Sequence, residues 1–239
     1  GYVMVKYNGT NEKVKLQITC PDQSCYTYLI SDRGAYDTFP LTAGNGSYAL
    51  QVLENVAGDT YTVSLAQSIN VSIEDEFLPF LYPNQYVNFH TDSKAVSKGS
   101  DLAKDTYSDL DVVQNIYNYV IKNISYDTEK AQNVSYGYVP DIDDTLSSKK
   151  GICFDYAALM TSMLRSQNIP TKLEVGYSGD AYHAWISTYI DDKGWVDDII
   201  QFNGNTWQIM DPTLAATNDS AAVKKYVGDG SHYVVKYTY

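Results

Sequence analysis

The chain has 239 residues, a formal net charge of −12 and a composition that is 44% hydrophobic and 19% charged. These proportions are typical of a globular protein and exclude a largely disordered one, and the length allows one large or two modest domains. The acidic excess argues against nucleic acid or an anionic membrane as a partner, because both would repel the chain.

No apolar run approaches the roughly 18 residues that a membrane-spanning helix needs. The sequence begins Gly-Tyr and shows no signal peptide, and it contains 23 tyrosines against six phenylalanines. A Tyr-rich composition with many Asn, Ser and Thr residues favours an extracellular surface. We therefore expect a secreted or cell-surface protein whose signal peptide lies outside this sequence.

The first third of the chain predicts β-structure. Apolar and polar residues alternate in five short segments separated by Gly-, Asn- and Asp-containing turns. The segments are 14–19, 26–30, 48–53, 61–65 and 69–73. We expect a small all-β, sandwich-like domain over residues 1–75. It carries no catalytic pattern, so it either has a structural role or binds a cell-surface partner.

Cys20 and Cys25 flank a turn-like hexapeptide between two of these segments. A disulfide across the turn is favoured in an oxidising compartment, with two free thiols as the alternative. A metal site is disfavoured, because no second cysteine pair or nearby histidine completes a tetrahedral set. A disulfide here would leave Cys153 as the single unpaired thiol.

Residues 76–107 are expected to hold a linker and the start of a second domain, whose main body spans 108–239. In this domain Ser108 is predicted to cap a helix whose apolar stripe runs from Val112 to Val120.

The polar stretch 132–150 is predicted to be irregular and to form one wall of a substrate cleft. Its aspartates, Asp141, Asp143 and Asp144, resemble part of a calcium loop but lack the glycine and the distal glutamate of that motif. A solvated loop is therefore the favoured interpretation.

A glycine turn then runs into an amphipathic helix that ends near Asn168. Gly151 is expected to supply unusual backbone angles at the entry, and Asp155 places negative charge in the first turn. Cys153 falls at the N-terminus of this helix, where backbone N–H groups and the helix dipole favour a thiolate. The alternative is a small buried hydrophobic residue, which is what most cysteines outside disulfides are.

Downstream, strand-like runs are expected at 171–177, 183–190, 206–210 and 233–239, with a short helix at 221–226. His183 begins one of these runs and Asp211 follows another. A thiol needs a base to take its proton, and an imidazole needs a carboxylate to fix its tautomer.

These motifs resemble the transglutaminase-like cysteine protease superfamily. The likeness rests on Gly-x-Cys-x-Asp-Tyr-Ala at 151–157, His-Ala-Trp at 183–185 and Asp-Pro-Thr at 211–213, in the family's order. The resemblance implies an α+β, papain/transglutaminase-like core, in which the helix bearing the nucleophile packs on an antiparallel sheet. It implies Cys153 as nucleophile, His183 as base and Asp211 as the residue that orients the base.

The chemistry expected from this triad is acyl transfer on peptide or side-chain amides, without a cofactor or a metal ion. A cysteine protease or amidase acting on a protein or peptide substrate is favoured, because bacterial relatives of this architecture look more like proteases than cross-linkers. A protein-glutamine cross-linking transglutaminase and a non-catalytic peptide- or surface-binding module are the alternatives. The oxyanion is expected to meet the Cys153 N–H and one further donor, for which Gln132 and Tyr126 are weak candidates.

Overall fold

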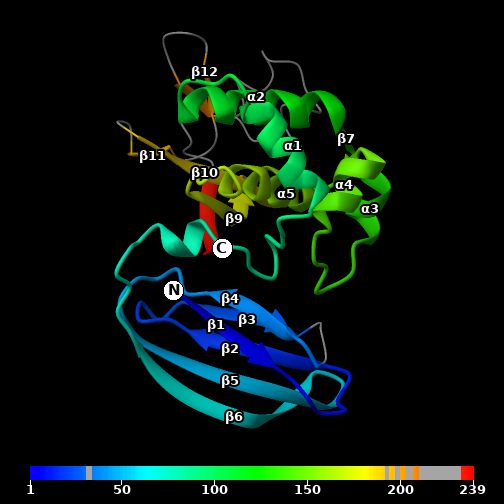
Figure 1. Ribbon diagram of the computed structural model, residues 1–239. Coiled ribbons are helices and arrows are strands. Elements are labelled where there is room, and N and C mark those ends of the chain that lie inside the picture. The colour runs from blue at the N-terminus through cyan, green and yellow to red at the C-terminus, as the bar shows by residue number, and fades with distance from the viewer. Residues whose placement is uncertain (31–33, 192–193, 197–199, 203–206, 210–232) are drawn as a thin grey trace. The chain divides into compact units, whose positions relative to one another are not determined.

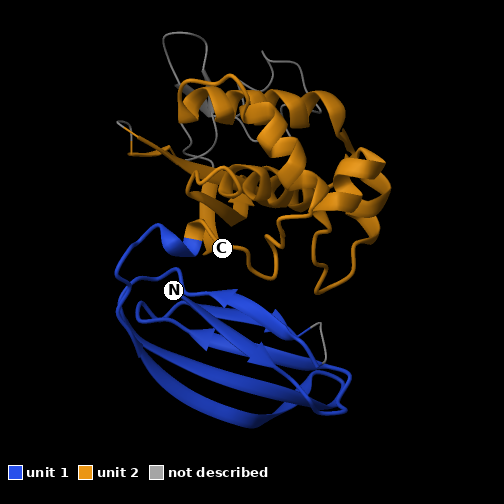
Figure 2. Cartoon of the chain, viewed as in Figure 1, with its two compact units in different colours: residues 1–79 blue, residues 80–239 orange. Residues whose placement is uncertain are grey.

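The computed structural model describes residues 1–30, 34–191, 194–196, 200–202, 207–209 and 233–239 (Figure 1). The chain divides into two compact units, Gly1–Pro79 and Phe80–Tyr239 (Figure 2). In its described residues the first unit is built of strands up to η1, a short 3-10 helix that spans the boundary between the units, whereas the second unit combines helices and sheets. The α+β class and the all-β region before the core are therefore confirmed.

The first unit is built from two antiparallel sheets. Strands β1 and β4 form a pair, and the second sheet has the order β3-β2-β5-β6 (Figure 1). The bounds are β1 Tyr2–Lys6, β2 Val14–Thr19, β3 Cys25–Leu29, β4 Tyr36–Pro40, β5 Gly46–Ala57 and β6 Thr60–Val71. Strands β1 and β4 were not predicted. The two strands expected at 61–65 and 69–73 are one continuous strand, β6, because all of it pairs with β5.

Alternation along β2 explains how this unit forms its core. Val14, Leu16 and Ile18 are buried, while the residues between them are only half-buried. The rings of Tyr28 on β3 and Phe39 on β4 lie with their centroids 4.8 Å apart, so they join the two sheets.

The predicted disulfide between Cys20 and Cys25 is wrong, because in the described part of the chain both residues are thiols. Cys20 continues the buried face of β2, whereas Cys25 opens β3 on its exposed face. The hairpin register pairs Thr19 with Cys25, so the two cysteines are not opposite each other. An offset of one position turns the two side chains to different faces.

The second unit places helices against an antiparallel sheet of order β11-β10-β9-β14 (Figure 1). Two short strands, β7 and β8, pair in parallel, and β12 pairs with β13. The helices are η1 Leu78–Phe80, α1 Lys94–Ala103, α2 Asp109–Asn123, α3 Thr128–Asn133, α4 Ile142–Ser148 and α5 Cys153–Arg165. The strands are β7 Ser125–Tyr126, β8 Lys150–Gly151, β9 Thr171–Ser178, β10 Ala181–Ile190, β11 Gly194–Val196, β12 Ile200–Phe202, β13 Trp207–Ile209 and β14 Tyr233–Thr238.

Helix α5 is the centre of this unit. Every residue from Asp155 to Arg165 is buried, and the helix contacts α1, α2 and α4 as well as β8, β9 and β10. A helix that is buried all round needs neighbours on several sides, and here helices and the sheet provide them. The predicted packing of this helix on an antiparallel sheet is confirmed.

The stretch 132–150, predicted to be irregular, contains the end of α3 and the whole of α4. Its aspartates form helix caps. The Asp141 carboxylate accepts hydrogen bonds from the N–H groups of Asp143 and Asp144 at the start of α4. The Asp143 carboxylate accepts from the N–H groups of Lys94 and Ala95 at the start of α1, at 3.0 and 2.9 Å. These helices could not be recognised from the sequence, because the residue types that cap helices also form turns.

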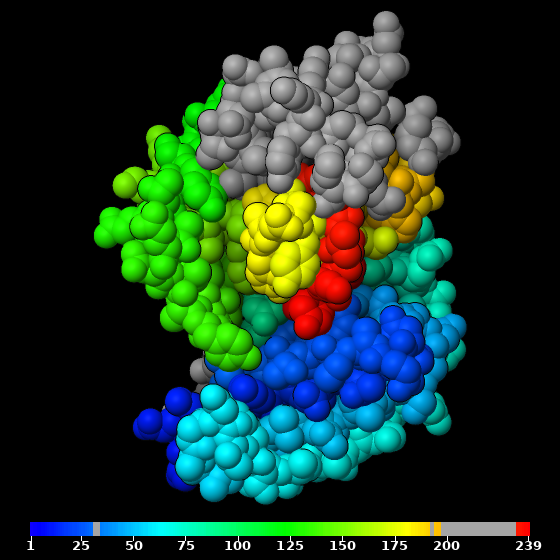
Figure 3. Space-filling model, turned by 180° about the vertical axis from the view of Figure 1, so that it is seen from behind, coloured from blue at the N-terminus to red at the C-terminus, as the bar shows by residue number. Residues whose placement is uncertain are grey.

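Strand β14 pairs with β9 in antiparallel orientation. Figure 3 shows β14 in red at the surface of the second unit. The pairing contains a bulge between Val235 and Tyr237. A Cβ on Gly176 would lie 2.0 Å from the Val234 carbonyl oxygen, so the strands approach this closely only because residue 176 is glycine. In the described part of the chain, no helix has the length and apolarity to cross a membrane.

Candidate active site

Cys153 is the first residue of α5 and is half-buried. The preceding residue, Ile152, has an extended backbone with φ −94° and ψ 176°, so the helix begins sharply at the cysteine. The first N–H groups of a helix have no partner within the helix, and the dipole adds partial positive charge there. Both features favour the thiolate form of Cys153.

Gly151 has a different role from the one predicted. Its φ is not among the positive values of the described residues, so it supplies no unusual backbone angle. Instead, a Cβ on Gly151 would lie 2.7 Å from the Asp155 Cβ and 3.2 Å from its Oδ2. Glycine is needed here because the buried Asp155 side chain packs directly against the backbone before the nucleophile.

We expect Gly151→Ala to destabilise the second unit by about 1–3 kcal/mol, as overpacking in a buried site typically does. The added methyl group would push the Asp155 carboxylate away and shift the start of α5. Chemical denaturation followed by tryptophan fluorescence measures the loss, because all three tryptophans lie in residues 80–239. The control is Ala103→Gly at the end of α1, which exchanges alanine and glycine away from the site. Gly58→Ala is unsuitable as a control, because the φ of Gly58 is +51°. Unchanged stability in Gly151→Ala would contradict this account of the glycine.

His183 lies on β10, which packs against α5. It is half-buried, and its Nε2 atom is shielded from solvent. The neighbouring Tyr182 interacts electrostatically with the Cys153 thiol. The start of β10 and the start of α5 therefore lie in the same region of the unit, and the pairing of Cys153 with His183 stays a prediction.

Tyrosines surround this region, which the sequence analysis did not foresee. Tyr182 and Tyr177 face each other across the β9–β10 pair, with ring centroids 5.5 Å apart, and remain 59% and 40% exposed. Burial, followed by the nearby Tyr237, Tyr177 and Cys153, raises the pKa of Tyr182. The phenol therefore stays protonated at neutral pH and presents a neutral, half-apolar surface beside the thiol. The only signal in the sequence was the high tyrosine content.

Asp211, the predicted third member of the triad, lies outside the described residues, and so does the predicted helix 221–226. Strand β13 ends two residues before Asp211. The role of Asp211 therefore stays a prediction. Among the described residues, no three or more His, Cys, Asp or Glu side chains are grouped to hold a metal ion.

The central part of the chain is similar to known proteins. Residues 97–197 match the family model of the transglutaminase-like superfamily. This segment contains α5 and β10, and therefore Cys153 and His183, but it ends before Asp211. The match covers less than half of the chain, so the likeness to the transglutaminase-like superfamily is a likeness of this segment.

Two relatives match part of the chain. A UPF0252 protein of Methanocaldococcus jannaschii is 30% identical over 118 aligned residues, and the match covers 43% of this chain and 34% of that protein. The mouse kyphoscoliosis peptidase is 30% identical over 107 aligned residues, and the match covers 39% of this chain and 16% of the peptidase. The chain thus spans about a third or less of the length of these relatives.

Solved structures are similar at a looser level. A candidate cysteine protease from Cytophaga hutchinsonii has a TM-score of 0.45 at 16% identity, covering 89% of this chain and 71% of its own. The periplasmic domain of TgpA from Pseudomonas aeruginosa has a TM-score of 0.42 at 14% identity, covering 82% and 85%. Red sea bream transglutaminase has a TM-score of 0.33 at 14% identity, covering 87% and 49%.

Proposed function

We propose that this protein catalyses thiol-dependent acyl transfer on peptide or side-chain amides, as a cysteine protease or amidase. The observation that carries the proposal is the position of Cys153 at the first residue of a buried helix, with His183 on the strand packed against that helix. In this proposal Cys153 is the nucleophile, His183 the base and Asp211 the carboxylate that orients the imidazole.

The reaction would begin with transfer of the Cys153 proton to His183. The thiolate attacks the amide carbonyl carbon, and the C–N bond breaks as the imidazolium gives its proton to the leaving amine. The thioester that remains on Cys153 is then attacked by water, with His183 again taking a proton. The products are a carboxylic acid and the regenerated thiol.

The negative oxygen formed in each attack would accept a hydrogen bond from the Cys153 N–H. Tyr126 is a better candidate for the second oxyanion donor than Gln132. It is half-buried on β7 and pairs with Gly151, two residues before the nucleophile, whereas Gln132 is exposed on α3.

Two other functions fit the same residues. If a primary amine such as a lysine side chain reaches the thioester before water does, the product is a cross-link and the protein is a transglutaminase. If the thiol is not activated, the domain is a peptide-binding module. The exposed tyrosines beside Cys153 favour binding of an extended peptide in either case.

Selective alkylation tests whether the thiol is activated, and the chain contains its own reference. Cys25 is exposed and is the first residue of a strand in the other unit. At pH 6 and limiting iodoacetamide, we expect Cys153 to react at least about tenfold faster than Cys25, because a thiolate and not a thiol attacks the reagent. Peptide mass spectrometry measures both sites in one sample. Equal or slower labelling of Cys153 would favour the binding module.

A second assay separates hydrolysis from amine transfer. The full chain is incubated with a denatured, glutamine-containing protein and a fluorescent primary amine. We expect new peptide termini or released ammonia, with little fluorescence on the protein. Incorporation of the amine without cleavage or net hydrolysis would show that the protein is a transglutaminase and not a protease.

A further inference from the structure

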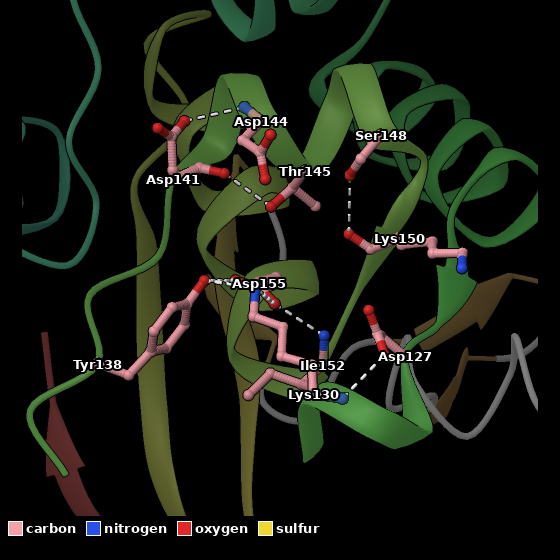
Figure 4. A network of polar contacts seen from close by, with 10 residues as sticks. All are labelled: Asp127, Lys130, Tyr138, Asp141, Asp144, Thr145, Ser148, Lys150, Ile152 and Asp155. Atoms are coloured by element: carbon pink, nitrogen blue, oxygen red, sulfur yellow. Dashed lines mark hydrogen bonds and ion pairs between the residues drawn. The ribbon is translucent and has the colours of Figure 1, made fainter. Parts of the chain in front are cut away.

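A buried ion pair lies beneath the first turn of α5 (Figure 4). Asp155 is fully buried, and its carboxylate accepts three hydrogen bonds. The Lys130 Nζ donates to Oδ2 at 2.7 Å, the Tyr138 hydroxyl donates to Oδ1 at 2.6 Å, and the Ile152 N–H donates to Oδ2 at 2.8 Å. The last bond holds the residue that immediately precedes Cys153.

Lys130 closes the network from the other side. Its Nζ also donates to the Tyr138 hydroxyl at 2.6 Å, so the ammonium, the phenol and the carboxylate form a triangle. Burial opposes the charged form of Lys130, but its hydrogen bonds to Asp155 and Tyr138 outweigh this effect and raise the pKa of the ammonium. Burial and the bond to Asp155 raise the pKa of Tyr138 to about 12. At neutral pH the triangle therefore contains one cation, one anion and one neutral donor.

The triangle is anchored to the chain around the nucleophile at several points. The Asp127 carboxylate accepts from the Lys130 N–H at 2.9 Å and so caps α3. The Asp127 N–H donates to the Gly151 carbonyl at 2.9 Å, which ties the same residue to β8. Figure 4 shows Lys130 and Tyr138 reaching Asp155 from separate segments. Residues from α3 and from the segment before α4 thus meet at the start of α5.

We propose that Lys130 and Tyr138 are positioning residues, which hold the first turn of α5 and neutralise Asp155 so that Cys153 remains acidic. A carboxylate two residues after the thiol opposes thiolate formation, because like charges in a poorly solvated region repel. The Lys130 ammonium cancels that repulsion and leaves the partial positive charge of the helix N-terminus in effect. This inference rests on the proposed function, which requires an activated Cys153.

Other groups near this turn do not supply the same compensation. The charged side chains on the elements that contact α5 are Lys94, Lys98 and Asp101 on α1, Asp109, Asp111 and Lys122 on α2, Asp143 and Asp144 on α4, Lys150 on β8, and Lys172 and Glu174 on β9, with His183 on β10. Lys94, Lys122 and Lys150 are exposed, Lys98 lies over the Tyr119 ring, and Lys172 lies over the Trp195 ring. Among the described residues, Lys130 is the cation that forms an ion pair with Asp155.

The sign of the charge effect gives the test. The rate of iodoacetamide reaction at Cys153 is measured from pH 4 to pH 10, and its midpoint gives the pKa of the thiol. We expect Lys130→Met to raise the midpoint by about one unit and Asp155→Asn to lower it, as nearby charges shift pKa values by about 1–3 units. The double variant should return close to the wild-type midpoint, because it removes both charges.

A merely structural role would produce a different pattern, because damage to the first turn would move all three midpoints in the same direction. Lys130→Arg keeps the charge and should keep the midpoint, and Tyr138→Phe should cause a smaller shift than Lys130→Met. Circular dichroism and tryptophan fluorescence confirm that each variant is folded before it is labelled. The proposal would be overturned if Lys130→Met left the midpoint unchanged. It would also be overturned if the midpoint of the double variant shifted as far as that of Lys130→Met. A wild-type midpoint near that of Cys25 would instead refute the proposed function itself.

Discussion

Cys153→Ala should lower turnover at least about a thousandfold and leave the fold intact. The nucleophile is lost entirely, and removal of a member of a catalytic triad leaves only the effects of binding and of the oxyanion donors. The substitution removes one sulfur atom from a half-buried position, so little packing changes. Amide hydrolysis is measured with the substrate identified by the assays above.

Cys25→Ala is the matched control, because it removes an exposed thiol of the first unit. It should retain full activity. The two variants should unfold at the same denaturant concentration as the wild-type chain when followed by tryptophan fluorescence. Substantial turnover in folded Cys153→Ala would show that the thiol is not the nucleophile.

Arg165→Met should destabilise the second unit by about 3–5 kcal/mol, because three backbone carbonyls each lose a hydrogen bond and an acceptor left unsatisfied costs about 1–3 kcal/mol. Arg165 is 3% exposed and ends α5, where a cation is favoured by the helix dipole. Its Nε donates to the Thr171 carbonyl at 2.9 Å, and its Nη1 and Nη2 donate to the Tyr82 and Tyr239 carbonyls, each at 2.7 Å. Burial lowers the pKa of the guanidinium to about 9, so it remains protonated at neutral pH.

The large effect follows from what the substitution leaves behind. Methionine fills a similar volume but donates no hydrogen bond, so each of the three carbonyls loses the bond from Arg165, and two of these bonds are buried. Arg165→Lys should be intermediate, because one ammonium cannot reproduce the planar fork of a guanidinium. Lys104→Met removes an exposed ion pair with Asp101 and should leave the unfolding midpoint unchanged. If Arg165→Met also unfolds at the wild-type urea concentration, the three-carbonyl bridge does not stabilise the unit.

Several elements could be predicted from the local sequence pattern, because burial of one side of the strand or helix determines that pattern. The alternation of β2 and the apolar stripe of α2 each reflect burial on one side, and both elements appear where they were expected. Ser108 accepts a hydrogen bond from the Asp111 N–H, which is the cap that the sequence indicated. Cys153 also stands at a helix N-terminus as predicted, since the apolar period of α5 begins directly after it.

Other features depended on partners that the local pattern does not reveal. Strands β1 and β4 were missed because each is stabilised by pairing with the other across about thirty residues of chain. Helices α3 and α4 were missed because polar, Asp-rich segments are equally compatible with loops. The disulfide was wrong because the faces of Cys20 and Cys25 are decided by strand register, which spacing alone does not specify.

By itself, the sequence determined which residues could perform the chemistry and in what order they occur: a cysteine at a helix start, then a histidine on a strand, within a segment that matches the family model of the transglutaminase-like superfamily. Only the tertiary structure decided what surrounds them. Folding brings together three residues from separate segments, Lys130, Tyr138 and Asp155. Residue 151 is glycine because the Asp155 side chain packs against it. Residue type follows from local chemistry, whereas the charge balance at a site follows from contacts between distant parts of the chain.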